Sequence, residues 1–323
     1  MSSSRPAAVG GNPWDREGID PAHIYTSRLR SVYGGCVHVY TDGAKDLITG
    51  RTGAAFSEKA SGSEVLRRLS DHLDVFTAEL IAVLLALQWV EEKVQGGVVV
   101  FSDSCTVLKS LQSCSSRSRQ DLVLEVLETL GRVVRKGCQV RFAWVPAHVG
   151  VEGNEAADRL AKKALGEKEV SLVVKWSKGE AKSFVWGKVM ESWQEQWDRG
   201  EKGRHLYRVQ REVGRKRMLG GGRREGTIYT RLRIGHCRLN GSLHRIGKHP
   251  TGMCEYCENE ETVEHVLLHC RHYVRERECM RESLRECGIL EITLVNLLGG
   301  AEVDRRFDIL FSFLRDTGLE GRV

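Results

Sequence analysis

Residues 148–158 read His-Val-Gly-Val-Glu-Gly-Asn-Glu-Ala-Ala-Asp, and three upstream segments also carry an acid in a distinctive setting. These segments are Tyr-Thr-Asp-Gly (40–43), Thr-Ala-Glu-Leu (77–80) and Ser-Asp-Ser (102–104). If a fold brought the four acids together they would repel, because two like charges ~4 Å apart cost on the order of 4 kcal/mol at an effective dielectric near 20. Proteins tolerate such clusters mainly when cations bind them, and oxygen ligands of this kind suit Mg²⁺. The four segments therefore predict a divalent-cation site like that of a metal-dependent nuclease.

The order of predicted elements around these segments indicates an α/β fold. Alternating or β-branched runs predict strands, and longer apolar periodicities predict helices. We expect strands at 36–41, 53–57 and 64–70, a buried helix at 77–94, a strand at 98–102, helices at 106–112 and 120–135, a strand at 140–145 and a helix at 154–165. This order predicts a mixed five-stranded sheet with an antiparallel start, parallel later strands and flanking helices.

The same pattern predicts that the four acids meet. Asp42 and Asp103 come at the carboxyl ends of predicted strands, where open α/β sheets bind ligands. Glu79 falls in the first turn of its predicted helix, and Asp158 follows Asn154, a predicted helix N-cap, by four residues. Because strand ends and helix starts can lie at one edge of a sheet, we expect a common site.

Residues 35–166 resemble the type 1 ribonuclease H family, whose motifs occur here in the family's order and at compatible spacing. The resemblance implies two Mg²⁺ ions, or Mn²⁺, held by the catalytic carboxylates Asp42, Glu79, Asp103 and Asp158. It also implies an active-site role for His148, and substrate contacts at Gly43 and Asn154. The implied activity is endonucleolytic hydrolysis of the RNA strand of RNA–DNA hybrids by a two-metal mechanism, with contacts to ribose 2′-hydroxyls setting specificity.

Two of these residues also have simpler interpretations. The helix dipole favours an acid such as Glu79 near a helix start, and His148 lies in a glycine-rich segment typical of a solvent-facing loop. The predicted helix is otherwise apolar almost all round, which favours Glu79 as a ligand. The nearby Asp158 favours a role for His148 in proton transfer or product release, since histidine titrates near neutral pH.

Composition is that of a globular protein, with 41% hydrophobic and 28% charged residues. The longest apolar run is too short to cross a bilayer, and no apolar signal core begins the chain. We therefore expect an intracellular protein of the nucleus or cytoplasm without membrane contact. The Ser-, Pro- and Gly-containing residues 1–34 are expected to be a disordered extension.

Positive charge is concentrated in residues 201–250, where fourteen Lys and Arg face three acids in a chain of net charge +6. Residues 35–166 hold sixteen basic and sixteen acidic residues, and 113–120 lacks the longer basic helix that many ribonucleases H carry there. A long basic run is typical of a solvated face or of a polyanion-binding surface. Beside a nuclease domain we favour nucleic-acid contact, and we expect hybrid affinity to depend on elements outside residues 35–166.

Six of the ten cysteines crowd the C-terminal third among histidines, which favours metal over disulfides. Residues 254–270 carry the spacing Cys-x2-Cys-x7-His-x4-Cys, a donor set suited to tetrahedral Zn²⁺. The predicted ligands are Cys254, Cys257, His265 and Cys270. His269 and His272 are rival ligands, and we expect few residues here to form a core without zinc.

A predicted helix at 179–198 places four large side chains on one face, for which helix packing is favoured over base stacking: Trp186, Met190, Trp193 and Trp197. This helix, Thr-Arg-Leu-Arg-Ile-Gly-His (230–236) and the Cys/His element resemble the C-terminal end of a non-LTR retrotransposon polyprotein. The resemblance implies a reverse transcriptase as a partner. No Asp-Asp pair of a polymerase occurs, so we expect a fragment, a truncated copy or a reused descendant.

We expect a ribonuclease H domain at 35–166, a helical and basic connector at 167–235, a mainly helical zinc-binding region at 236–290 and a helical tail at 291–323. A catalytically silent nucleic-acid-binding remnant of a retroelement is an alternative function. A DNA transposase or integrase on the same sheet is disfavoured, because the helix Glu and the terminal Asn-x-x-x-Asp follow the ribonuclease pattern. The oligomeric state stays open.

Overall fold

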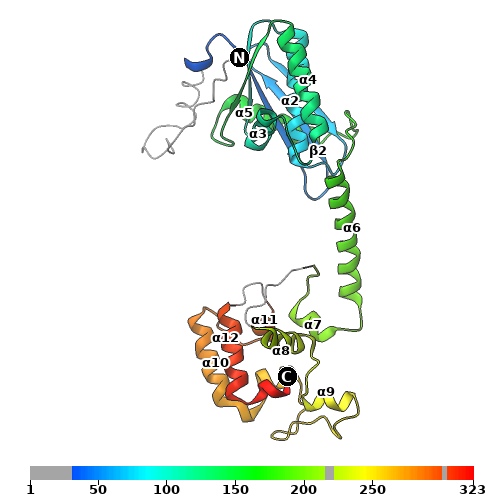
Figure 1. Cartoon of the computed structure of the whole chain (residues 1–323), viewed down its shortest axis with the longest axis vertical. Coiled ribbons are helices and arrows are strands. Elements are labelled where there is room, and N and C mark those ends of the chain that lie inside the picture. The colour runs from blue at the N-terminus through cyan, green and yellow to red at the C-terminus, as the bar shows by residue number, and fades with distance from the viewer. Residues whose placement is uncertain (1–30, 215–221, 300–303) are drawn as a thin grey trace. The chain divides into compact units, whose positions relative to one another are not determined.

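The computed structural model describes residues 31–214, 222–299 and 304–323 (Figure 1). The described residues divide into two compact units, with the boundary between Val185 and Trp186. Of the extension expected to be disordered, residues 1–30 lie outside the described residues. In the described part of the chain, no helix combines the length and apolar character needed to cross a membrane.

A five-stranded sheet forms the centre of the first unit, in the order β3-β2-β1-β4-β5. Its strands are β1 (Val37–Lys45), β2 (Thr52–Glu58), β3 (Ser63–Leu69), β4 (Gly97–Ser102) and β5 (Gln139–Trp144). β2 pairs antiparallel with both β1 and β3, whereas β4 pairs parallel with both β1 and β5. The predicted mixed sheet with an antiparallel start is confirmed.

Helices cover both faces of this sheet, because successive side chains of a strand point to opposite faces. The helices are α2 (Val75–Lys93), α3 (Cys105–Ser113), α4 (Gln120–Arg135) and α5 (Glu152–Leu165) (Figure 1). Val39 and Val98 share one buried cluster with side chains of α2 and α4. Their chain neighbours Tyr40 and Val99 belong to another cluster with Ala157 of α5. The sheet therefore lies between two helical layers.

The first unit extends past residue 166 into the segment that we assigned to the connector. Leu172 forms a β-bridge with Leu69 at the end of β3. The indole Nε1 of Trp176 donates a hydrogen bond to the Asp71 carbonyl at 2.8 Å. Residues 167–185 consequently pack against the sheet domain, and the helix α6 (Lys178–Arg199) begins within this unit.

A buried carboxylate fastens the start of α6 to the domain. The Oε1 atom of Glu180 accepts hydrogen bonds from the Asp74 amide at 2.9 Å and the Thr77 hydroxyl at 2.7 Å. Its Oε2 atom accepts from the Ser177 amide at 2.7 Å and from the buried Arg119 guanidinium at 3.4 Å. One side chain thus joins α6, the start of α2 and the residue before α4.

The second unit is helical in its described residues. After the remainder of α6 come α7 (Arg204–Val209), α8 (Arg223–Ile234), α9 (Asn240–Arg245), the single π-helical turn η1 (His265–His269), the short 3-10 helix η2 (Arg271–Tyr273), α10 (Val274–Glu286), α11 (Leu294–Leu298), α12 (Asp304–Asp316) and the 3-10 helix η3 (Leu319–Arg322) (Figure 1). The predicted mainly helical character of the C-terminal region is confirmed.

This unit has a hydrophobic core of its own, formed by side chains from well beyond the region expected to bind zinc. Leu232 of α8, Leu267 of η1 and Leu284 of α10 are fully buried, and α12 adds Leu310 and Leu314. We did not predict this core, because its members come from segments as much as 80 residues apart or more. The region expected to bind zinc and the expected tail therefore share one core.

The predicted tryptophan face of α6 is only partly packed. Trp197 donates from Nε1 to the Gln210 carbonyl at 3.0 Å, and its ring lies 5.8 Å from that of Tyr207. Trp186 and Trp193 are 61% and 48% exposed. Helix packing, the favoured interpretation, therefore accounts for Trp197 but leaves these two residues about half exposed among the described residues.

We predict that Glu180→Gln destabilises the first unit by about 2–3 kcal/mol, because it removes one partner of a buried ion pair and replaces an acceptor of two amides. Urea unfolding of the full chain, compared with Glu191→Gln on the exposed part of the same helix, measures the effect. Equal unfolding midpoints for the two variants would contradict the prediction.

Candidate active site and candidate metal centres

Three acidic side chains from three elements converge at one edge of the sheet. Asp42 lies in β1, Glu79 in α2 and Asp103 directly after β4. A carboxylate oxygen of each lies within 4.8 Å of those of the other two. Asp42 and Glu79 are buried, with 6% and 5% of their surfaces exposed, and Asp103 is half-buried. Three of the four predicted acids therefore form a compact cluster.

Asp42 lies inside its strand, and the prediction that the strand ends there is wrong. Parallel pairing with β4 stops at Thr41↔Ser102, directly before Asp42. The opposite edge of β1 continues to pair with β2 as far as Lys45↔Thr52. The strand therefore keeps its extended backbone at Asp42, while the end of β4 leaves that side open for Asp103.

Gly43 lets α2 lie close against β1. A Cβ atom at this position would lie 2.6 Å from the carbonyl carbon of Ala78, and closer still to the amide nitrogen of Glu79. The close approach brings Glu79 beside Asp42. Glu79 is the fifth residue of α2, which begins at Val75, and not part of the first turn as predicted. Because the dipole acts mainly on the first turn, it does not account for an acid here.

The fourth predicted acid, Asp158 on α5, belongs to a neighbouring group. Its carboxylate lies with His148 and Glu155 in a set whose ligand atoms are all within 4.8 Å of one another. It also pairs with Lys162 at 2.8 Å. Its charge nevertheless raises the pKa of Asp42, so it lies near the first cluster. We did not predict Glu155, although it precedes Asp158 by three residues and so lies on the same helical face.

His148 is an exposed residue in a left-handed backbone conformation, with φ of 55°. This conformation is uncommon for residues other than glycine. In the same loop the Gly150 amide donates a hydrogen bond to Glu155 at 3.4 Å. His148 therefore lies in a solvent-facing loop and also lies close to Asp158, so both features considered for it are present.

We predicted that Asn154 caps α5, and this prediction is wrong. The helix begins at Glu152 with Val151 before it, so Asn154 lies in its first turn. Its side chain is buried, and Nδ2 donates a hydrogen bond to Oδ2 of Asp103 at 3.3 Å. Asn154 therefore contacts a cluster carboxylate.

Burial and mutual repulsion raise the pKa values of the clustered carboxyl groups. Burial, aided by the charges of Asp103 and Asp158, raises the pKa of Asp42 from 3.8 to about 7. Burial and then the charges of Asp42 and Asp103 raise the pKa of Glu79 well above 4.5. The amide of Gly43 lowers both values but does not cancel the rise. Near neutral pH, the ionised cluster is therefore costly without a cation.

The donor set fits a divalent cation. The Oε2 atom of Glu79 is buried and has no hydrogen-bond partner among the described residues. An unpaired buried oxygen costs about 1–3 kcal/mol, and more when charged. A cation held by Asp42, Glu79 and Asp103 would coordinate such an oxygen and offset the repulsion, and oxygen-only ligands suit Mg²⁺ or Mn²⁺.

A second donor cluster, in the second unit, consists of the four predicted zinc ligands, whose atoms lie within 4.8 Å of one another: Cys254, Cys257, His265 and Cys270. The Sγ atom of Cys257 lies 3.1 Å from Nε2 of His265 and 3.9 Å from Sγ of Cys270. The Sγ atoms of Cys254 and Cys270 are 3.8 Å apart. A tetrahedron with Zn–S bonds of ~2.3 Å has edges of about 3.8 Å, so the cluster is compatible with zinc.

The rival ligands lie outside this cluster. Among the described residues neither His269 nor His272 joins it, and the ring of His272 stacks on that of Tyr256 with centroids 3.5 Å apart. All ten cysteines are free. Burial raises the pKa of the Cys254 thiol to about 12, so metal binding there would release its proton.

Without Mg²⁺, we predict that Asp42→Asn stabilises the first unit at pH 8, by up to about 4 kcal/mol. Asp42 binds its proton more tightly in the folded state, so its contribution is most favourable below pH 4 and is lost as the pH rises from 3.8 to about 7. Urea unfolding at pH 5 and pH 8 measures the difference between wild type and variant. A difference that does not grow with pH would contradict the prediction, and Mg²⁺ should stabilise the wild type more than the variant.

We predict that Cys254→Ser removes the zinc bound by the full chain, because three remaining donors leave a site that binds far more weakly. Metal analysis after dialysis in chelator-free buffer measures the stoichiometry. Cys279→Ser on α10, at an exposed cysteine, is the matched control and should keep its zinc. Equal zinc content in both variants would remove the assignment.

Comparison with known protein families gives one match that covers the carboxylate cluster. The family model described as RNase H matches residues 35–166, which hold all five strands, α2 to α5 and both acidic groups. The mixed sheet with flanking helices fits that fold, and a domain of this kind supports nuclease activity on RNA–DNA hybrids in general. Residues 35–166 of this chain are therefore an RNase H domain.

Proposed function

We propose that the chain is an endoribonuclease that hydrolyses the RNA strand of RNA–DNA hybrids with two Mg²⁺ ions, for which Mn²⁺ can substitute. One observation carries the proposal: Asp42, Glu79 and Asp103 converge beside the group containing Asp158, and the buried Oε2 of Glu79 has no partner among the residues that the structure describes. Such a cluster costs stability unless it serves a cation. Its position in an RNase H domain favours phosphodiester hydrolysis over a purely structural metal site.

The acidic residues divide into two sets in this proposal. Asp42, Glu79 and Asp103 hold one cation, and Asp158 holds the second together with its neighbour Asp42. Bound ions of this kind supply an activated water and stabilise the charge on the leaving oxygen. Lys162, which pairs with Asp158, must release that carboxylate when a cation binds there.

His148 and Asn154 have supporting roles. An imidazole nitrogen of His148 accepts or delivers a proton beside Asp158, or the side chain assists product release, and its exposure suits contact with substrate. Asn154 holds Asp103 through Nδ2, and its buried Oδ1 has no hydrogen-bond partner in the described part of the chain. The family resemblance also implies substrate contacts at Gly43 and Asn154, and both residues are buried in the described structure.

Hybrid affinity comes largely from outside the RNase H domain. Residues 35–166 are balanced in charge, whereas residues 201–250 carry the basic excess. Phosphate contacts by Lys and Arg supply most of the non-specific affinity for nucleic acid. The Cys/His cluster is in this proposal a structural zinc site that stabilises the second unit.

The wider setting follows from the resemblance to the C-terminal end of a non-LTR retrotransposon polyprotein. In that setting the chain derives from a retroelement, works in the nucleus or cytoplasm, and removes template RNA after a reverse transcriptase has copied it. A reverse transcriptase is then its protein partner.

We predict that the full chain cleaves an RNA–DNA hybrid with Mg²⁺ and that Asp103→Asn lowers kcat at least about 100-fold, because it removes a charged ligand. Glu125→Gln, at an exposed acid on α4, should retain wild-type activity. Gel analysis of labelled hybrid, duplex DNA and duplex RNA identifies the substrate. Hybrid binding without cleavage by the wild type would favour the catalytically silent remnant, and equal cutting of duplex DNA would contradict hybrid specificity.

A further inference from the structure

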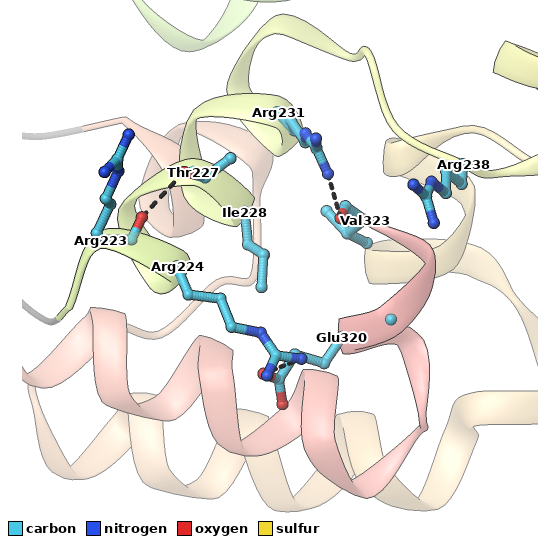
Figure 2. Close-up of a pocket in the computed structure, with 9 residues that line it drawn as sticks. Arg223, Arg224, Thr227, Ile228, Arg231, Arg238, Glu320 and Val323 are labelled. Carbon is cyan, nitrogen blue, oxygen red and sulfur yellow. Dashed lines mark hydrogen bonds and ion pairs between the residues drawn. The ribbon is translucent and has the colours of Figure 1, made fainter.

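An arginine-lined pocket of about 540 Å³ lies in the second unit, formed by α8, the segment between α8 and α9, and η3. The charged residues that line it are Arg223, Arg224, Arg231, Arg238 and Glu320. Figure 2 shows the side chain of Ile228 between these groups. The pocket therefore carries four arginines and one acid around a partly apolar lining.

The positive charge of the pocket is only partly compensated. Arg224 lies 3.4 Å from Glu320, and Arg231 donates a hydrogen bond to a Val323 oxygen at 3.2 Å. In the described ranges no carboxylate pairs with Arg223 or Arg238. At least two guanidinium groups thus remain available to an anion.

The wall that carries Glu320 and Val323 is firmly held. Arg322 of η3 donates from Nη1 and Nη2 to the buried Glu261 carboxylate at 2.9 and 2.6 Å. The Asn240 amide donates to the same carboxylate at 2.6 Å. The Arg238 amide in turn donates to the Arg322 carbonyl at 2.7 Å. The backbone of Arg238 is thereby fixed to η3, which lowers the cost of ordering this wall around a ligand.

We propose that this pocket binds consecutive phosphate groups of a nucleic-acid strand. Guanidinium groups match phosphate oxygens through paired hydrogen bonds. Figure 2 shows Arg223 and Arg238 on opposite sides of the pocket, with Arg224 and Arg231 between them. Four arginines around one pocket can contact more than one phosphate of a strand, whereas a single phosphate or mononucleotide reaches only part of them.

A lipid surface is a poorer match for this pocket. Membrane-binding surfaces combine basic residues with exposed apolar side chains that enter the bilayer. Here the apolar lining consists of Ile228 and Val323, and both are buried. The four arginines are exposed, but no exposed apolar side chain stands among the residues that line the pocket, and this favours a nucleic-acid strand over a lipid surface.

This inference rests on the proposed function for its choice of nucleic acid as the ligand. Whether the pocket binds a strand is nevertheless tested independently of hydrolysis. The pocket and the carboxylate cluster belong to different compact units, so strand binding and hydrolysis can fail separately. The pocket also gives the basic segment 201–250 a definite binding position, at Arg223, Arg224, Arg231 and Arg238.

The test measures binding of a labelled RNA–DNA hybrid and of single-stranded RNA by the full chain carrying Asp103→Asn. This background prevents cleavage without a chelator, which would strip zinc. Adding Arg223→Gln and Arg238→Gln should raise Kd on the order of tenfold and reduce the slope of log K against log salt by about two. Zinc content and unfolding midpoint should not change, because neither guanidinium has a described partner.

Arg275→Gln with Arg285→Gln is the matched control, since both arginines are exposed on α10. An equal loss in this control, or wild-type binding by the pocket variant, would overturn the proposal. If a mononucleotide competes as strongly as a strand, the proposal of consecutive phosphates is overturned and the pocket binds a single phosphate group. Arginine-dependent binding of phosphatidylserine vesicles without strand binding would overturn it in favour of a membrane. If strand binding depends on these arginines but the wild-type chain cleaves no hybrid, the pocket proposal is supported and only the proposed hydrolysis is contradicted.

Discussion

The contact between α2 and β1 at Gly43 is the constraint on which the RNase H domain depends. It presses the backbone of α2 against the strand and thereby holds Glu79 beside Asp42, with Asp103 arriving from the end of the adjacent strand. The same packing that buries the apolar surface of α2 also buries two carboxyl groups. Their raised pKa values record the resulting repulsion. The domain thus carries a local cost that a bound cation would offset.

The two acidic groups come from different elements of the domain. Asp42, Glu79 and Asp103 come from the sheet and from the helix on one face, whereas His148, Glu155 and Asp158 come from α5 and the loop before it, on the other face. Asn154 joins the groups through its hydrogen bond to Asp103. In our proposal Asp42, Glu79 and Asp103 would hold one cation and Asp158 with Asp42 the second, and two such ions would supply an activated water and stabilise the leaving oxygen.

The second unit has a different basis for its stability. Its core draws on helices from α7 to α12, and the Cys/His cluster lies at the margin of that core with Cys254 and Cys270 buried in it. The Glu261–Arg322 pair then ties the end of the described chain to the segment before η1. We infer that these links keep the arginine-lined pocket in shape, so that the basic segment acts as a defined surface and not as a diffuse charge.

Local pattern alone determined the order of strands and helices, the four acidic segments and the spacing of the Cys/His ligands, because periodicity and motif spacing are properties of neighbouring residues. It misplaced Asp42 at a strand end and Asn154 at a helix cap, since β1 is extended by β2 on one edge only and α5 starts earlier than its cap signal. It also missed Glu155, the core of the second unit and the pocket at Arg223 and Arg238. Only the tertiary structure decided these features, because each depends on which distant segments pack together, and sequence spacing does not record that contact.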